Sequence, residues 1–124
     1  QPDKYQVVHD FRNLEYPLLC VGLRRDWLQG NEATTRDFLA ALVDAEAELQ
    51  ADTSVALTVA RDKFVDIEAP VLEAAVTNTL PRLSKDGRIS EQAHQNVLDQ
   101  QLFAGTITTP IPFRQAVDLS YLPA

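Results

Sequence analysis

Apolar residues follow two different periods along this chain. Near the start, residues 5–9 (YQVVH) and 17–23 (PLLCVGL) form short apolar runs rich in β-prone residues, which predict one or two strands. From residue 32 onward, apolar residues recur every three or four positions, and this spacing predicts helices. A pair of strands is marginal in water unless other strands or a helical face cover it. The pattern therefore predicts a mostly helical chain that corresponds to the later part of a larger α/β protein.

The strongest helix is predicted over residues 32–51, behind Asn31 as its N-cap. Phe38, Leu42 and Leu49 belong to one apolar stripe of this helix, and the opposite side carries acidic residues. Further helices are expected over residues 54–63 behind Asp52 or Thr53, from about Ile67 behind Asp66, and after Ser90 up to Gly105. Pro81 is expected to end or kink the second of these helices. The run 106–112 contains two prolines and is expected to be extended.

Composition and charge narrow the class of protein. The chain has 124 residues, of which 45% are hydrophobic and 23% are charged, as in an ordinary folded domain. Its net charge of -7 argues against a nucleic-acid partner, because phosphate binding needs a surplus of lysine and arginine. No apolar run approaches the length of a membrane span.

The residues that usually carry chemistry form no recognised cluster. His9 and His94 have no carboxylate or thiol neighbours at ligand spacing, so a structural or surface role is expected for both. Cys20 is the only cysteine, and its apolar neighbours predict a buried thiol. We therefore expect no catalytic residue, no metal site and no cofactor, and the chain is not expected to be an enzyme.

One short charged segment follows the second apolar run. Arg25 could present its planar guanidinium to a sulfonate, phosphate or carboxylate. In the alternative interpretation, Arg24 and Arg25 lie on the surface and Asp26 partly neutralises them.

Several segments in a fixed order resemble one family. Residues 16–28 (YPLLCVGLRRDWL), then Asn31 and the helix containing 36–45 (RDFLAALVDA), resemble a passage of bacterial ABC-transporter substrate-binding proteins. The group is the nitrate, sulfonate and taurine type, with the related binding proteins for thiamine pyrimidine precursors. The closing segments strengthen the resemblance, which covers nearly the whole chain: KDGRIS at 85–90, LD at 98–99, AGTI at 104–107, PF at 112–113 and VDLSYL at 117–122.

The resemblance implies a fold for the parent protein. It is an α/β periplasmic-binding-protein fold, two-lobed and type II-like, which closes on a small solute like a hinge. Residues 1–16 would end the second lobe and form the crossover, and residues 17–124 would be the C-terminal helical portion of the first lobe. The missing N-terminal half of the same protein would then be a partner, and it would supply most ligand contacts.

The resemblance also implies a function. The parent would be the solute-binding component of an ABC importer, which captures a sulfonate, nitrate, taurine or pyrimidine-like solute and delivers it to the permease. It would act outside the inner membrane, in the periplasm or as a cell-surface lipoprotein. Within this chain, ligand contacts are expected near the crossover, at Tyr16, Pro17 and Arg25.

Two alternatives remain open on the sequence. Helices that lack the sheet they cover are expected to pair as a homodimer that buries Phe38 and Leu42. In the first alternative, the chain is a small helical interaction or oligomerisation domain without a ligand. It could also be part of an enzyme that resembles the pyrimidine synthases of thiamine biosynthesis, but such an enzyme needs a histidine- and cysteine-rich active part that this segment does not display.

Overall fold

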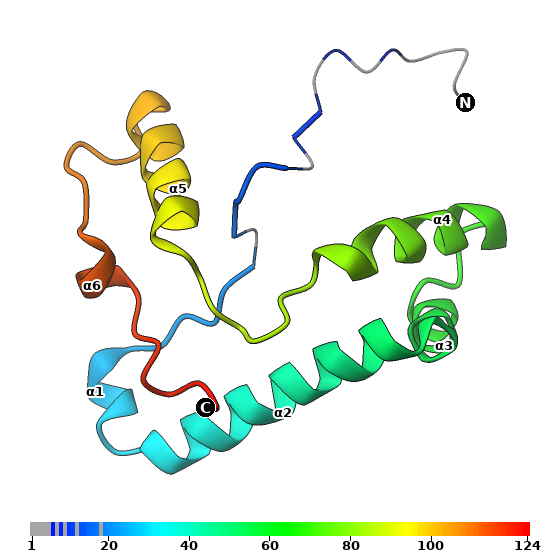
Figure 1. Ribbon diagram of the computed structural model, residues 1–124, viewed down its shortest axis with the longest axis horizontal. Helices are drawn as coiled ribbons and strands as arrows, with labels where there is room; N and C mark the ends of the chain where they lie inside the picture. Colours follow the sequence, from blue (N-terminus) through cyan, green and yellow to red (C-terminus); the bar gives the residue numbers. More distant parts are fainter. Residues whose placement is uncertain (1–5, 7, 9, 12, 18) are drawn as a thin grey trace. The chain divides into compact units, whose positions relative to one another are not determined.

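The computed structural model describes residues 6, 8, 10, 11, 13–17 and 19–124, and every regular element within them is a helix (Figure 1). The elements are α1 (Arg25–Leu28), α2 (Glu32–Ala51), α3 (Thr53–Lys63), α4 (Ala69–Thr79), the 3-10 turn η2 (Leu80–Arg82), α5 (Glu91–Phe103) and α6 (Phe113–Ala116). The prediction of a mostly helical chain is confirmed.

The prediction of N-terminal strands is wrong where the structure describes the chain. The described residues of the run 17–23 form no strand, and Leu19 is 91% exposed. A strand needs a second strand to take its backbone N–H and C=O groups, and the described chain offers none. In the run 5–9, residues 5, 7 and 9 lie outside the described residues, and residues 6 and 8 are not in a strand.

The chain divides into two compact units. One comprises Gln1–Gly22 and Ile89–Asp118, with α5 and α6, and the other comprises Leu23–Arg88 and Leu119–Ala124, with α1 to α4 and η2. The two units are groups of residues that pack together within this chain, and they do not correspond to the predicted lobes. The predicted boundary between two lobes at residue 16 therefore stays a prediction.

Helix α2 has the bounds that the sequence predicts. Its N-terminal Glu32 places a negative charge in the first turn, where the helix dipole favours it. Asn31 occupies the N-cap position as predicted, but its side chain makes no capping bond to α2, and its amide nitrogen donates to the carbonyl of Trp27 at 2.7 Å. This bond ties the start of α2 back to α1.

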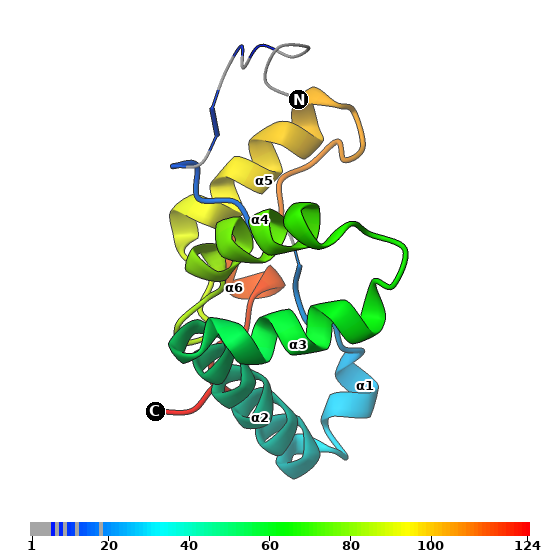
Figure 2. The ribbon, with the colours of Figure 1, turned by 90° about the vertical axis from the view of Figure 1, so that its right-hand side faces the viewer.

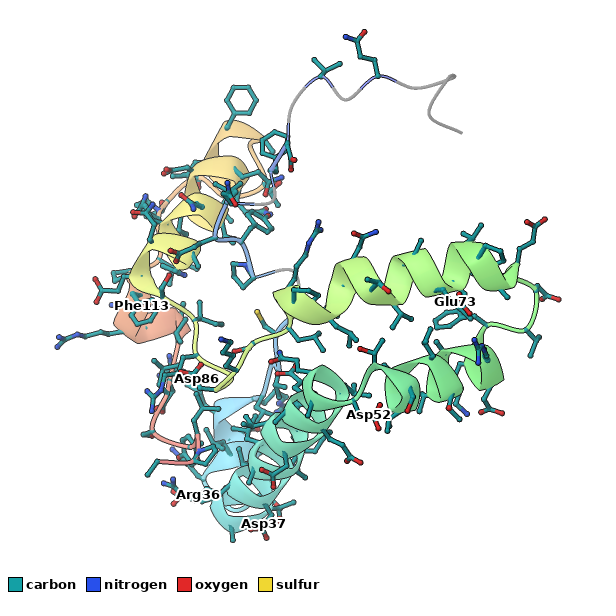
Figure 3. The ribbon with its side chains drawn as sticks, turned by 45° about the vertical axis from the view of Figure 1, so that its right-hand side comes forward. Arg36, Asp37, Asp52, Glu73, Asp86 and Phe113 are labelled. Atoms are coloured by element: carbon teal, nitrogen blue, oxygen red, sulfur yellow. The ribbon has the colours of Figure 1, made fainter. Side chains whose placement is uncertain are left out.

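Helices α3 and α4 contact each other as a helical hairpin (Figure 2). Their buried residues are Ala56 and Ala60 on α3 and Leu72 on α4. The two alanines are four residues apart and share one face of α3, so their small side chains leave room for a large one opposite. Arg61 of α3 also pairs with Glu73 of α4 at 2.6 Å, and Figure 3 labels Glu73 on the hairpin. Both residues of this pair are half exposed, so burial at the alanines and Leu72 dominates the hairpin's stability.

Proline positions explain the two ends of α4. The helix was expected to begin near Ile67 behind Asp66, but it begins at Ala69 with Glu68 at the N-cap position. Pro70 occupies the first turn, where its missing N–H is not needed. Pro81 stops the helix as predicted, since it cannot donate to the preceding turn, and the chain tightens into η2.

Asp52 links α2 to α3 and caps α3 as predicted (Figure 3). One of its carboxylate oxygens accepts from the Ser54 hydroxyl at 2.7 Å and from the Ser54 backbone N–H at 2.8 Å. These two bonds, the side-chain bond first, lower the pKa of Asp52 below its usual value.

The cap makes the stability of α3 depend on pH. Because the folded-state pKa is below the unfolded one, the contribution of Asp52 is complete above the unfolded pKa and is lost as pH falls through the folded pKa. We expect Asp52→Asn, which keeps a capping oxygen but does not titrate, to weaken the acid-induced loss of helicity in a circular-dichroism titration. Identical acid transitions for the two proteins would contradict this role.

The unit that contains α5 is organised around that helix. Ser90 caps it as predicted, and its hydroxyl oxygen accepts from the Ala93 backbone N–H at 3.0 Å. The same hydroxyl donates to the Glu15 carboxylate, and the Asn96 side chain donates to the Glu15 carbonyl at 2.8 Å. Ala93 and Leu98 are the buried apolar residues of α5. The segment around Glu15 is thus held along one side of α5.

Ser90→Ala is expected to lower the free energy of unfolding by about 1 kcal/mol, since it removes the N-cap bond. It also removes the donor to Glu15. Urea denaturation of the variant measures the loss, and Ser90→Thr, which keeps a hydroxyl, is the matched control. A Thr variant as weak as the Ala variant would show that the hydroxyl is not the stabilising group.

Candidate functional site

The three residues predicted to contact ligand fall into different units. Tyr16 and Pro17 belong to the unit of α5, and Arg25 is the first residue of α1 in the other unit. The Tyr16 hydroxyl donates to the Gln100 side chain at 2.8 Å, and Pro17 is half-buried. Arg25 is exposed. Their role in ligand binding stays a prediction.

The charged segment at α1 matches the surface interpretation for Arg24. Its guanidinium forms a two-pronged contact with Asp26, with Nε donating to Oδ1 at 3.0 Å and a second nitrogen donating to the other oxygen. This contact, followed by the Trp27 backbone N–H, holds the pKa of Asp26 below its usual value. Arg24 is therefore engaged with a carboxylate of its own segment.

Cys20 and His94 both lie in the described part of the chain. Cys20 is exposed, so the prediction of a buried thiol is wrong, because neither a strand nor a helix forms from its apolar run. His94 has the structural role expected for it: its Nε2 donates to the Ile111 carbonyl at 2.9 Å, and its ring meets Phe113 edge-on with centroids 5.6 Å apart. This pair fastens the extended run before α6 to α5. His9 lies outside the described residues.

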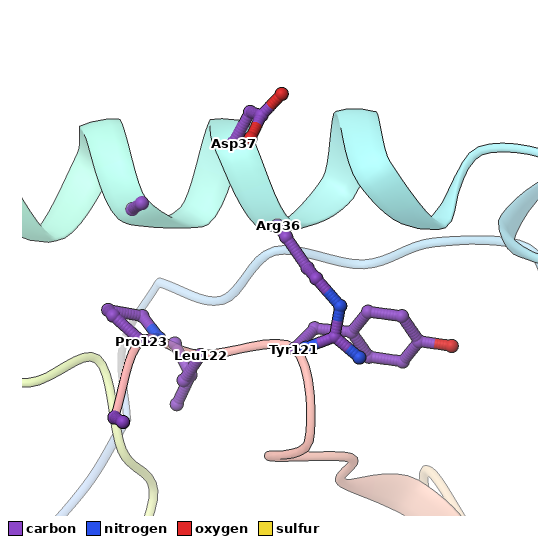
Figure 4. Close-up of a pocket in the computed structure, with 7 residues that line it drawn as sticks. Arg36, Asp37, Tyr121, Leu122 and Pro123 are labelled. Atoms are coloured by element: carbon purple, nitrogen blue, oxygen red, sulfur yellow. The ribbon is translucent and has the colours of Figure 1, made fainter.

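A cavity of about 390 Å³ lies between α2 and the C-terminal segment (Figure 4). Its lining consists of Arg36, Asp37, Ala40, Tyr121, Leu122, Pro123 and Ala124, all within one unit. This cavity is wide open to solvent, and its lining is more apolar than polar.

Arg36 is the polar group that gives this cavity its chemistry. Its guanidinium carbon lies 4.7 Å from the centre of the Tyr121 ring, which is cation–π distance. Its Nη1 donates to the Ser120 carbonyl at 2.6 Å. Figure 4 shows the side chain directed from α2 toward Tyr121. The sequence analysis missed Arg36 as a site residue, since contact with residues 84 and 85 positions away has no local signal.

A second feature is an uncovered apolar surface on α2 to α4, defined here by the exposed large apolar residues of those helices and the α3–α4 loop. Among them, Phe38 is 54% exposed although the sequence places it on the main apolar stripe of α2. The surface consists of Phe38, Leu42, Val59, Phe64, Val65, Ile67 and Val71. No side chain among the described residues is less than 2% exposed. These helices therefore present apolar side chains that their own unit does not cover.

Two other kinds of site are not found in the described part of the chain. No group of three or more histidine, cysteine, aspartate or glutamate side chains there could hold a metal ion. None of the helices described is both long and apolar enough to cross a membrane.

Comparison with known proteins adds no relative. No protein-family model, no curated protein and no solved structure matches this chain.

Proposed function

We propose that this chain is the helical portion of the solute-binding component of an ABC importer. The complete protein captures a small anionic or heterocyclic solute, of the sulfonate, nitrate, taurine or pyrimidine type, and delivers it to a permease without catalysing a reaction. It acts outside the inner membrane, in the periplasm or as a cell-surface lipoprotein. The rest of the polypeptide supplies the α/β layers on which these helices pack.

The uncovered apolar surface carries this proposal. Phe38 and Leu42 repeat at helical spacing, which is the pattern of a helix face that packs against another element. Large apolar side chains that stay exposed on a helix face are available to pack against another polypeptide. The cover expected here is the sheet of the parent fold.

The order of segments that resembles the family supports the same proposal. The resemblance assigns residues 1–16 to the end of the second lobe and the crossover, and 17–124 to the helical part of the first lobe. In that arrangement Tyr16, Pro17 and Arg25 lie near the solute, and most ligand contacts come from the N-terminal half.

The melting temperature of the protein encoded by the complete reading frame tests the function. We expect at least one of taurine, an alkanesulfonate, nitrate or a pyrimidine precursor to raise it, because a ligand at 100 times its Kd adds about 2.7 kcal/mol to stability. That gain corresponds to a shift of several degrees. If no solute of these classes shifts the melting temperature at millimolar concentration, the proposed function is wrong.

A second candidate function is favoured by the same surface. A helical oligomerisation domain would cover Phe38 and Leu42 with a second copy of the chain. Sedimentation equilibrium of the product of the complete reading frame separates the two proposals, because in the 124-residue chain helices without their covering sheet would self-associate under either one. A dimer that Phe38→Asp dissociates supports the oligomerisation domain, and a monomer across a wide concentration range argues against it.

A further inference from the structure

Arg36 is the one cation of helix α2, which is otherwise acidic. Helix α2 carries five carboxylates and one cation, since its sequence is EATTRDFLAALVDAEAELQA. Within the part of the chain that the structure describes, none of these carboxylates, nor any other, pairs with Arg36. Among the described residues, the guanidinium therefore has no ion pair that a bound anion would have to displace.

The Arg36 side chain is also held in one position. The Tyr121 ring supports one face of the guanidinium, and the Ser120 carbonyl accepts from one nitrogen. A guanidinium has five N–H donors in a planar fork, so the bond to Ser120 leaves donors for a further acceptor. Because the side chain is already ordered, a ligand that binds it loses less conformational entropy on binding.

The cavity beside Arg36 combines this cation with apolar walls. Ala40, Leu122 and Pro123 contribute side chains without polar atoms. Asp37 also lines the cavity, but Figure 4 shows its carboxylate directed away from the C-terminal segment. A ligand here meets one fixed positive charge, one aromatic ring and an apolar wall.

We propose that this cavity binds a small carboxylate that carries an apolar or aromatic group. The planar guanidinium fork matches a carboxylate through two parallel hydrogen bonds. The apolar group lies against the wall formed by Ala40, Leu122 and Pro123. The site stands on residues of one unit and is independent of the proposed transport function.

Benzoate is the probe, and benzamide is the neutral molecule of matched shape. In nitrogen-15 NMR spectra of the 124-residue chain, benzoate is expected to shift the backbone amide signals of Ala40 and Tyr121. Benzamide is expected to bind at least about tenfold more weakly, a factor that corresponds to 1.4 kcal/mol. Three results would overturn the proposal: equal binding of benzoate and benzamide, benzoate shifts centred on residues outside the cavity, or no shift with benzoate at about 20 mM.

Substitutions identify the charge that binds. Arg36→Gln should abolish the benzoate shifts, and Arg36→Lys, which keeps the charge but not the fork, should weaken binding about tenfold. Arg24→Gln changes an arginine that already contacts Asp26, so it should leave binding unchanged. If the spectrum of the free Arg36→Gln protein shows that the C-terminal segment has moved, the Arg36→Lys variant is used instead. Benzoate binding by Arg36→Lys that is as tight as in the unchanged protein would contradict the proposal. So would an equal loss of benzoate binding in Arg24→Gln.

A peptide C-terminus has the same carboxylate chemistry as a small acid. A tripeptide that ends in phenylalanine, compared with its C-terminal amide, distinguishes the two sources. Tighter binding of the tripeptide than of benzoate assigns the site to peptide ends, and weaker binding assigns it to free small acids.

Discussion

Leu72→Ala is expected to lower the free energy of unfolding of the unit containing α2 to α4 by about 2–5 kcal/mol. Leu72 is 5% exposed, the lowest value among the buried apolar residues described. The other buried residues of the hairpin, Ala56 and Ala60, have single methyl groups that cannot fill the space left by an isobutyl group. A small domain has only about 5–15 kcal/mol of stability in total, so the variant should unfold at much lower urea concentration.

Val71 provides the matched control for Leu72. It is the preceding residue of α4 and is 56% exposed, so Val71→Ala should change the free energy of unfolding by less than about 0.5 kcal/mol. Urea denaturation followed by circular dichroism measures both variants. Equal losses for the two substitutions would show that the hairpin core is not where the structure places it.

Gly87→Ala is expected to be the second large effect, a loss of about 2–4 kcal/mol. Gly87 has a φ of +72°, a left-handed conformation that L residues with a Cβ rarely adopt. An added Cβ would also lie 2.9 Å from Leu122 Cδ2 and 3.3 Å from Val43 Cγ2. In the Gly87→Ala variant, the turn at residues 85–88 would therefore have both a strained backbone and crowded side chains.

Gly105 separates these two costs. Its φ is +69°, but a Cβ there would have no neighbour within 4 Å, so Gly105→Ala should lose only the conformational part, about 1–2 kcal/mol. The difference between the variants measures packing at Gly87. Adding Leu122→Ala to Gly87→Ala should recover part of that difference in a double-mutant cycle, and strictly additive losses would contradict contact between the two residues.

The sequence predicts the helices well because their signals are local. The apolar spacing over residues 32–51, the Asp52 cap and the Ser90 cap each involve residues within one or two turns. Pro81 ends α4 for an equally local reason, the missing N–H. Local spacing and capping therefore predict the helices, and they leave open which faces are covered.

The wrong predictions concern contacts that residue spacing alone does not specify. The run 17–23 has strand composition, yet Leu19 and Cys20 are exposed because a strand requires a partner that the described chain lacks. Asn31 stands at the N-cap position of α2, but its side-chain oxygen accepts no backbone N–H of the helix, and its NH2 group donates to the Trp27 carbonyl. Arg36 becomes a site residue only through the C-terminal segment, which no periodicity in α2 predicts.

We propose that the rest of a larger protein covers the apolar surface of α2 to α4. The labelling rate of a single cysteine at position 38 tests it most directly. The variant is Phe38→Cys with Cys20→Ser, because Cys20 is exposed and would react as well. Asp44→Cys, on the acidic side of α2, is the matched control.

The rate is measured with a maleimide in the 124-residue chain and in the product of the complete reading frame. We expect labelling at position 38 to be at least about tenfold slower in the complete product, because the site is then reached only by local opening, and labelling at position 44 to be unchanged. Equal rates at position 38 in the two proteins would show that the rest of the polypeptide does not cover this surface.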